Sequence, residues 1–155
     1  MVRVAEMAGA LGLLGLAISA SSGSASPAQQ PLPVGQARYT ESCGGCHGLL
    51  GASVPGDIPT LRDQVGTFLC TQEGRDYVIR LPNVAFSNMD DETLAKTMNF
   101  VMFDLGGDSV PRRLDPVRYT AAEVGALRKS PLKAQQVLRM RAAIWERATR
   151  ECATS

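Results

Sequence analysis

The feature that most constrains this chain is a run of five residues, Cys43-Gly44-Gly45-Cys46-His47. Two cysteines separated by two residues and followed directly by a histidine form the attachment pattern of a c-type haem. The two thiols can add to the vinyl groups of the haem, and the histidine then lies beneath the iron as an axial ligand. His47 is the only histidine in the chain, so no other imidazole competes for this role. The motif therefore predicts one covalent haem c per chain, held by Cys43, Cys46 and His47.

Two other uses of the motif find less support in the sequence. A C-x-x-C pair can be a redox disulfide, but that use expects strands and helices in alternation, and no segment alternates polar and apolar residues convincingly. A zinc site would need a second ligand pair at similar spacing. The two remaining cysteines, Cys70 and Cys152, stand far apart in the chain.

The N-terminus is typical of an export signal. Arg3 supplies a positive charge, although Glu6 largely cancels it, and residues 7–20 carry no charge. An apolar run of this length suits a signal peptide and is shorter than the roughly 20 residues of a membrane span. We therefore expect a signal peptide over residues 1–25, a periplasmic or otherwise exported protein, and no stable membrane insertion after cleavage. An uncleaved anchor is the alternative.

An exported location would allow the two cysteines outside the motif, Cys70 and Cys152, to form a disulfide. Disulfides form and persist in oxidising compartments, and an even remainder of cysteines in an exported protein favours a pair. A bond between Cys70 and Cys152 would attach the C-terminal part of the chain to the region that follows the motif. The alternative is two unpaired thiols.

Apolar periodicity predicts helices and almost no sheet. The acidic start Asp90-Asp91-Glu92 suits the N-terminus of a helix, and Gly106 and Gly107 would end it. Thr120 and Glu123 have the spacing of a capping box. The expected helices cover residues 35–42, 73–81 and 90–105, a short segment from Thr120, and a last segment that ends near Arg150.

The last helix is expected to begin with Ser130 as N-cap and Pro131 as the first helical residue. Its buried face would consist of Val137, Leu138, Ile144, Trp145 and Ala148. Several arginines give the C-terminal segment a basic bias, which usually marks a solvated helix face. The segment could cover the surface of the preceding domain or serve as a docking element for a partner.

Length and composition limit the classes of protein that the chain can belong to. With 155 residues, 45% of them hydrophobic and 20% charged, the chain fits one soluble domain. A net charge of +1 gives no electrostatic basis for binding nucleic acid. Aromatic residues make up only 5%, and a buried porphyrin would supply the large apolar group that such a core lacks.

The residues around the motif carry a family resemblance. Gly35, Tyr39 and Cys43 follow one another at helical spacing, Gly48 comes directly after the histidine, and Pro59 lies further on. Together with Asn99-Phe100 in the helix at 90–105, they resemble the class I (mono-haem) cytochrome c family. The resemblance covers roughly residues 33–105. It implies a small all-α fold around one covalent haem, in which Pro59 accepts a hydrogen bond from the ligand histidine.

The resemblance also implies an organisation of the chain. We expect a linker at 26–33, a cytochrome c haem domain at 34–106, and a helical C-terminal extension at 107–155 that packs on it. Gly35 would allow the first and last core helices to approach closely, and Tyr39 would pack near Phe100.

One departure from the family concerns the sixth iron ligand. Class I cytochromes place a methionine in the loop before the last core helix, but here Val84 stands near that position. Met89 is the nearest sulfur and is therefore the expected sixth ligand. A packing role for Met89, with the site vacant, is the alternative.

The resemblance implies single-electron transfer between a dehydrogenase or respiratory donor and an acceptor such as an oxidase. A carrier of this kind is not an enzyme. Two alternatives stay open: a haem enzyme or small-ligand sensor with an open iron site, and a fixed cytochrome subunit of a larger oxidoreductase.

Overall fold

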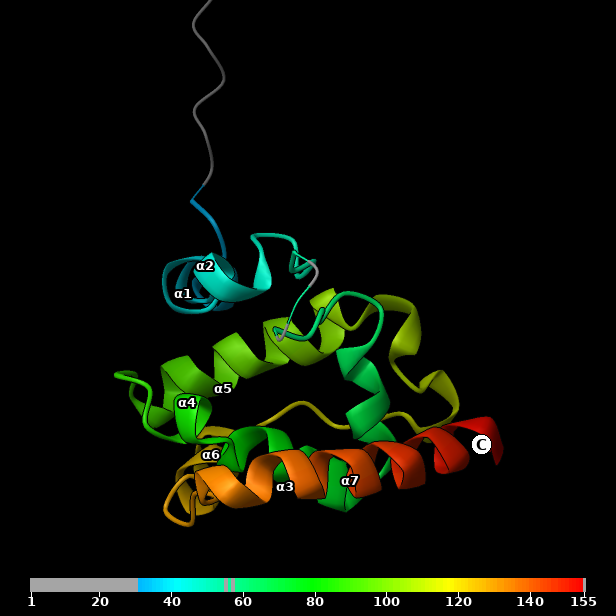
Figure 1. Ribbon diagram of the computed structural model, residues 1–155. Helices are drawn as coiled ribbons and strands as arrows, with labels where there is room; N and C mark the ends of the chain where they lie inside the picture. The colour runs from blue at the N-terminus through cyan, green and yellow to red at the C-terminus, as the bar shows by residue number, and fades with distance from the viewer. Residues whose placement is uncertain (1–30, 55, 57, 155) are drawn as a thin grey trace, which may run out of the picture. The chain divides into compact units, whose positions relative to one another are not determined.

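The computed structural model describes residues 31–54, 56 and 58–154. Within these ranges the chain is helical and contains no strand (Figure 1). None of the helices in this part of the chain is both long and apolar enough to cross a membrane. The predicted signal peptide and most of the linker lie outside the described residues.

Seven α-helices, three 3₁₀-helices and one π-helix follow one another in the described ranges. They are α1 (Val34–Ser42), α2 (Gly44–His47), η1 (Val65–Cys70), α3 (Gln72–Arg80), α4 (Pro82–Ala85), α5 (Asp91–Asn99), η2 (Phe100–Leu105), η3 (Gly107–Ser109), η4 (Arg112–Leu114), α6 (Ala121–Leu127) and α7 (Ala134–Thr154). The all-helical fold class predicted from the sequence is confirmed.

The first and last core helices, α1 and α5, pack closely. A Cβ atom at Gly35 would overlap the carbonyl oxygen of Lys96, so only glycine allows this approach. One α1 turn further on, the ring of the fully buried Tyr39 lies 5.5 Å from that of Phe100. The contact places the second half of α1, which leads into the cysteine motif, against the start of η2.

The helix predicted over 90–105 divides into two parts. Asp90 caps α5, because its side chain accepts a hydrogen bond of 2.7 Å from the backbone N–H of Thr93. From Phe100 the helix widens into the π-helical η2, and the N–H of Gly106 donates to the carbonyl of Val101. The short helices η1 and α4 were not expected from the sequence.

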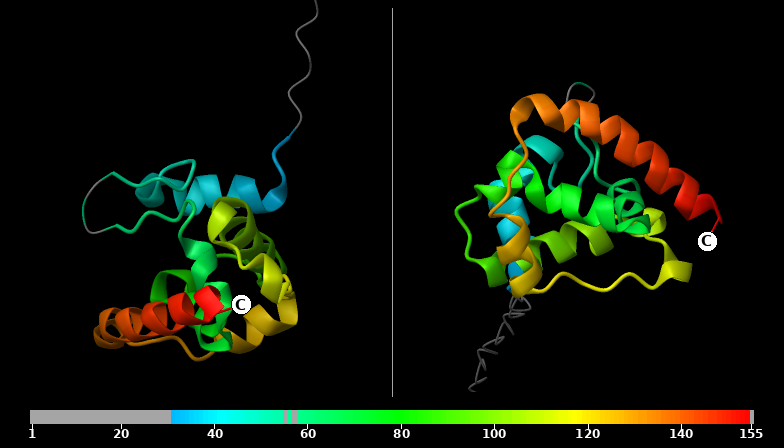
Figure 2. Two further views of the ribbon diagram at one scale, coloured as in Figure 1. Left: turned by 90° about the vertical axis from the view of Figure 1, so that its right-hand side faces the viewer. Right: turned by 90° about the horizontal axis from the view of Figure 1, so that it is seen from below.

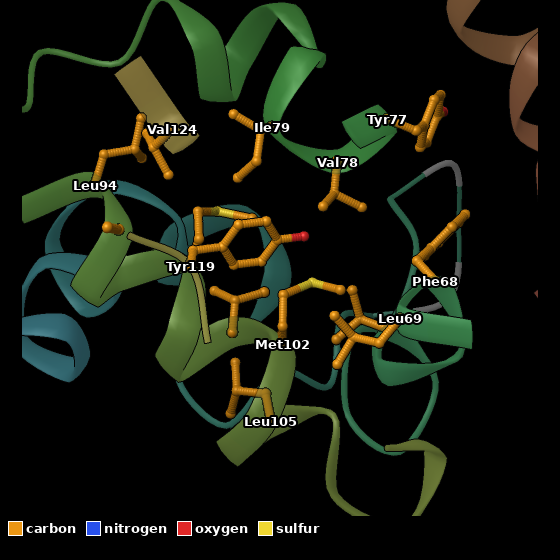
Figure 3. Packing of buried hydrophobic residues seen from close by; sticks show 14 of the residues in the cluster. Phe68, Leu69, Tyr77, Val78, Ile79, Leu94, Met102, Leu105, Tyr119 and Val124 are labelled. Carbon is orange, nitrogen blue, oxygen red and sulfur yellow. The ribbon is translucent and has the colours of Figure 1, made fainter. Parts of the chain in front are cut away.

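The C-terminal extension shares the core of the domain. Tyr119 is 4% exposed, and its backbone exchanges two hydrogen bonds with the side chain of Asn99. Its ring lies under the guanidinium of Arg75, 4.2 Å from the ring centre. Figure 3 shows Tyr119 and Val124 among side chains from η1, α3 and α5. The extension is therefore part of the domain's packing.

Helix α6 has half of the predicted capping box. The Thr120 hydroxyl accepts a hydrogen bond of 3.1 Å from the N–H of Glu123. The Glu123 carboxylate does not return to Thr120, because it pairs with the buried Arg75 at 2.9 Å. A tertiary ion pair thus replaces the local contact.

Helix α7 begins later than predicted. Residues 131–133 are not helical, and the N–H of Leu132 donates to the carbonyl of Arg80. Ser130 and Pro131 therefore do not start the helix, because this tertiary hydrogen bond draws the chain against α3. Ile144 and Ala148 are buried as expected, whereas Leu138 is 78% exposed.

Candidate haem-binding site

The cysteine motif forms a single helical turn. The carbonyl of Cys43 accepts hydrogen bonds from the N–H groups of Cys46, at 3.1 Å, and His47, at 3.0 Å. This turn brings the two thiols and the imidazole together. The chain leaves the turn at Gly48, whose φ of +77° favours glycine. The Tyr39 hydroxyl donates to the Gly48 carbonyl at 2.6 Å and holds the exit of the turn against α1.

The His47 imidazole has a defined orientation. Its Nδ1 atom lies 2.9 Å from the carbonyl oxygen of Pro59. A carbonyl oxygen can only accept, so Nδ1 carries the proton and donates. Nε2 is then the atom with a free lone pair, and it is the available metal ligand. A hydrogen bond of this kind also raises the donor strength of a ligating imidazole.

The structure sorts the four cysteines into two pairs. Cys70 and Cys152 form a disulfide that joins η1 to α7, with their Cα atoms 5.4 Å apart. Cys43 and Cys46 are free thiols, the first half-buried and the second exposed. Burial raises the pKa of the Cys43 thiol, and the neighbouring Cys46 thiol raises it further. The thiols that remain free are thus the two of the C-x-x-C-H motif.

A largely apolar cavity of about 510 Å³ opens beside the motif. This volume lies within the range of roughly 300–1,000 Å³ that is usual for cofactor pockets. Cys43, His47 and Pro59 line it together with side chains from η1, α3, α5 and α7. A thiol and an oriented imidazole thus face one apolar space. This donor set fits a covalently attached haem, with Cys43 and Cys46 for the vinyl groups and His47 for the iron.

Met89 does not line this cavity. Its sulfur accepts a hydrogen bond from the Thr97 hydroxyl at 3.6 Å, and the half-buried side chain packs on the hydrophobic core. Val84, near the family's ligand position, does line the cavity, as does Met98 of α5. The structure therefore does not bring Met89 together with His47, and Met89 as the sixth ligand stays a prediction.

Arg128, at the end of α6, explains the path of the loop that carries Met89. Its guanidinium donates to the carbonyls of Ala85 at 3.0 Å, Ser87 at 2.8 Å and Met89 at 2.7 Å. It also pairs with the Asp91 carboxylate at 3.0 Å. One side chain thus holds the whole loop between α4 and α5. This role could not be predicted, because no local pattern links Arg128 to residues 37 to 43 positions earlier.

The α7 contribution to the cavity was also missed. Val137, Leu138, Arg141 and Trp145 all line it. Trp145 is positioned by an edge contact with Phe68, at 5.3 Å between ring centres. Helical spacing in the sequence puts these positions on one face of α7. It does not tell that this face borders the cavity.

The all-helical fold around this cavity is consistent with that of a cytochrome c. Two named proteins resemble the chain in sequence, both called cytochrome c-552. The first, from Thermus thermophilus, is 28% identical over 120 residues, which cover 66% of this chain and 90% of that protein. The second, from a particular strain of the same species, is also 28% identical over 120 residues, with 80% of its length covered. No family model matches the chain. The relatives thus support a cytochrome c at a coarse level.

Proposed function

We propose that the chain is an exported c-type cytochrome that carries single electrons by means of one covalently bound haem c. The observation that carries this proposal is the placement of Cys43 and the Pro59-oriented His47 on one apolar cavity. The likeness to cytochrome c-552 supports the same function.

Each residue of the motif has a separate task. Cys43 and Cys46 would hold the haem through thioether bonds, and His47 would bind the iron through Nε2. The Pro59 carbonyl keeps the imidazole in one orientation and tautomer. When bound, the haem supplies an iron that changes between the ferric and ferrous states. The surrounding apolar side chains limit the access of water, which helps to set the reduction potential.

The location and partners follow from the same proposal. A signal peptide at residues 1–25 would take the chain to the periplasm or another exported location, where the Cys70–Cys152 disulfide is stable. Partners would be redox proteins, namely a dehydrogenase or respiratory donor and an acceptor such as an oxidase. We expect no nucleic acid and no stable membrane insertion after cleavage.

The loop before α5 favours a second candidate function. Arg128 holds this loop, Met89 turns toward Thr97, and the inert Val84 faces the cavity. A haem bound here would receive no ligand from this loop, which would leave its sixth iron position open to a small molecule unless Met98 of α5, which also lines the cavity, took it. The second candidate is therefore a sensor or enzyme that binds a small molecule at the iron.

A redox titration followed by optical spectra tests the leading function. The exported protein should show a c-type haem spectrum and one reversible one-electron transition. Carbon monoxide added to the reduced protein separates the two candidates. Slow or absent binding supports a carrier with a closed site, whereas rapid stoichiometric binding supports the open site. A protein without a reversible haem transition would contradict electron transfer.

A further inference from the structure

Helix α7 presents one continuous face to the haem cavity. Positions 134, 137, 138, 141 and 145 all line it, with the spacing of one side of an α-helix. Three anchors hold the helix there: the Cys70–Cys152 disulfide, the hydrogen bond of 3.2 Å from the Tyr77 hydroxyl to the Val137 carbonyl, and the ion pair between Arg147 and Glu73. The cavity is therefore completed by a segment outside the minimal cytochrome core.

Among the described residues that line this cavity, Arg141 is the only Lys, Arg, Asp or Glu. Its side chain is half-buried, and its charge acts on Tyr77. Burial raises the pKa of Tyr77, and the positive charge of Arg141 opposes that rise. The guanidinium thus lies near a buried phenol at the cavity wall.

The charge of Arg141 has no counter-ion in the part of the chain that the structure describes. Among the other arginines that are at least partly buried, Arg75 pairs with Glu123 at 2.9 Å and Arg128 with Asp91 at 3.0 Å. Arg62 and Arg80 have no carboxylate, but each donates to a backbone carbonyl. For Arg141 no ion pair occurs within residues 31–54, 56 and 58–154. A cation beside an apolar cavity is costly unless an anion compensates it.

A haem brings the missing negative charge. Its two propionate carboxylates are on the pyrrole rings that carry no vinyl group. With the vinyl groups bound at Cys43 and Cys46, the carboxylates belong in the part of the cavity remote from the motif. Figures 1 and 2 show α1 and α2 at one end of the domain and α7 along the opposite end. Arg141 reaches the cavity from that opposite end.

We propose that Arg141 binds a propionate carboxylate of the haem, which makes α7 a part of the cofactor site. This inference rests on the proposed function. Arginine suits the task because its planar guanidinium can pair with both oxygens of a carboxylate. The pair is electrically neutral, so the carboxylate contributes little net negative charge near the iron.

Removal of Arg141 has a defined electrochemical consequence. The carboxylate then carries an uncompensated negative charge, which favours ferric over ferrous iron and lowers the reduction potential. The pKa of this carboxylate also rises without Arg141. The reduction potential then begins to depend on pH at values closer to pH 7. The other titratable groups on the cavity wall are Tyr39, Tyr77, Cys43 and His47. Cys43 and His47 would be bonded to the haem. Burial raises the pKa of Tyr39 and of Tyr77, which keeps both phenols neutral.

The test uses haem-loaded variants of the full chain and measures the reduction potential between about pH 5 and pH 9. In this range the titration of an unpaired carboxylate is distinguishable from that of a carboxylate paired with arginine. We compare Arg141→Gln and Arg141→Lys with Arg139→Gln, which removes the same charge from an exposed position of the same helix. Arg141→Gln should shift the ferric–ferrous ratio toward ferric on the order of tenfold, or about 59 mV for one electron. Arg141→Lys should recover most of this shift, and Arg139→Gln should show little.

Two results would overturn the inference. In the first, Arg141→Gln and Arg139→Gln have the same potential at every pH. In the second, the potential is unchanged but azide binds the ferric iron more weakly, which would assign Arg141 to an external anion. If Arg141→Gln fails to fold, Arg141→Met keeps the length of the side chain and gives the same two readings. A wild-type protein without covalent haem would contradict the proposed function itself, before Arg141 is tested.

Discussion

The two sides of the cavity are built in different ways. On the motif side, the contacts join residues three, four or twelve positions apart, from Cys43 to Pro59. On the other side, the loop before α5 is held by Arg128, 37 to 43 positions away, and the wall is completed by α7. The difference suggests that haem attachment depends on a short segment. The surroundings of the sixth iron position depend on the tertiary structure of the whole domain.

The largest expected effect on stability comes from the disulfide between η1 and α7. Replacing both Cys70 and Cys152 by alanine opens a loop with a sequence separation of 82 residues. We expect a loss of about 4 kcal/mol in the free energy of unfolding, from the entropy gained by the unfolded chain. Urea denaturation of the haem-loaded protein measures it. Covalent haem should remain, because the motif side does not depend on α7; loss of attachment would contradict the division into two sides.

The second effect concerns the loop before α5. Arg128→Gln removes charge-assisted hydrogen bonds to three backbone carbonyls and one carboxylate. We expect a loss of about 3 kcal/mol, together with faster binding of carbon monoxide as the loop becomes mobile.

Arg150→Gln is the matched control for this loop. It removes an exposed pair with Glu146, four positions away on α7, which should cost no more than about 0.5 kcal/mol. Equal losses in the two variants would show that Arg128 does not hold the loop. Both are measured by the same denaturation and by stopped-flow mixing with carbon monoxide.

The third effect tests the contact between α1 and α5. Gly35→Ala places a methyl group against the Lys96 carbonyl, and we expect a loss of about 2 kcal/mol from overpacking. Gly45→Ala is the control, since a Cβ atom there would meet nothing within 4 Å. Thermal unfolding compares them. A similar melting temperature for both variants would mean that α1 and α5 do not approach as closely as described.

The smallest expected effect is on Met89. Because its sulfur faces Thr97 rather than the cavity, Met89→Leu should leave the spectrum of the oxidised haem protein unchanged. The near-infrared band of a sulfur–iron bond should be absent from both proteins. A band in the wild type that disappears in Met89→Leu would instead make Met89 the sixth ligand. That result would contradict the candidate function with an open iron position.

Local chemistry explains what could be predicted from the sequence. The all-helical class, the helix start at Asp90 and the cap at Thr120 depend on neighbours within four residues. The Cys70–Cys152 pair could be predicted because an expected export favours disulfides and the motif leaves an even number of cysteines. In each case a short pattern has one dominant physical outcome.

Tertiary competition explains what could not be predicted. Glu123 has the right spacing to complete a capping box, but the buried Arg75 takes its carboxylate. Helical spacing puts Leu138 on a buried face, yet its side chain is exposed where it lines the cavity. Met89 is the nearest sulfur to the expected ligand position, but Arg128 fixes its backbone. None of these partners can be identified from spacing along the chain.

The central claim is covalent haem at the motif, and the intact mass of the exported protein tests it most directly. The mature polypeptide should carry the mass of one added haem, which acidified acetone does not extract. In a variant with Cys43→Ser and Cys46→Ser, the haem should be absent or extractable. A wild-type mass equal to that of the bare polypeptide, or haem lost into acetone, would contradict the account.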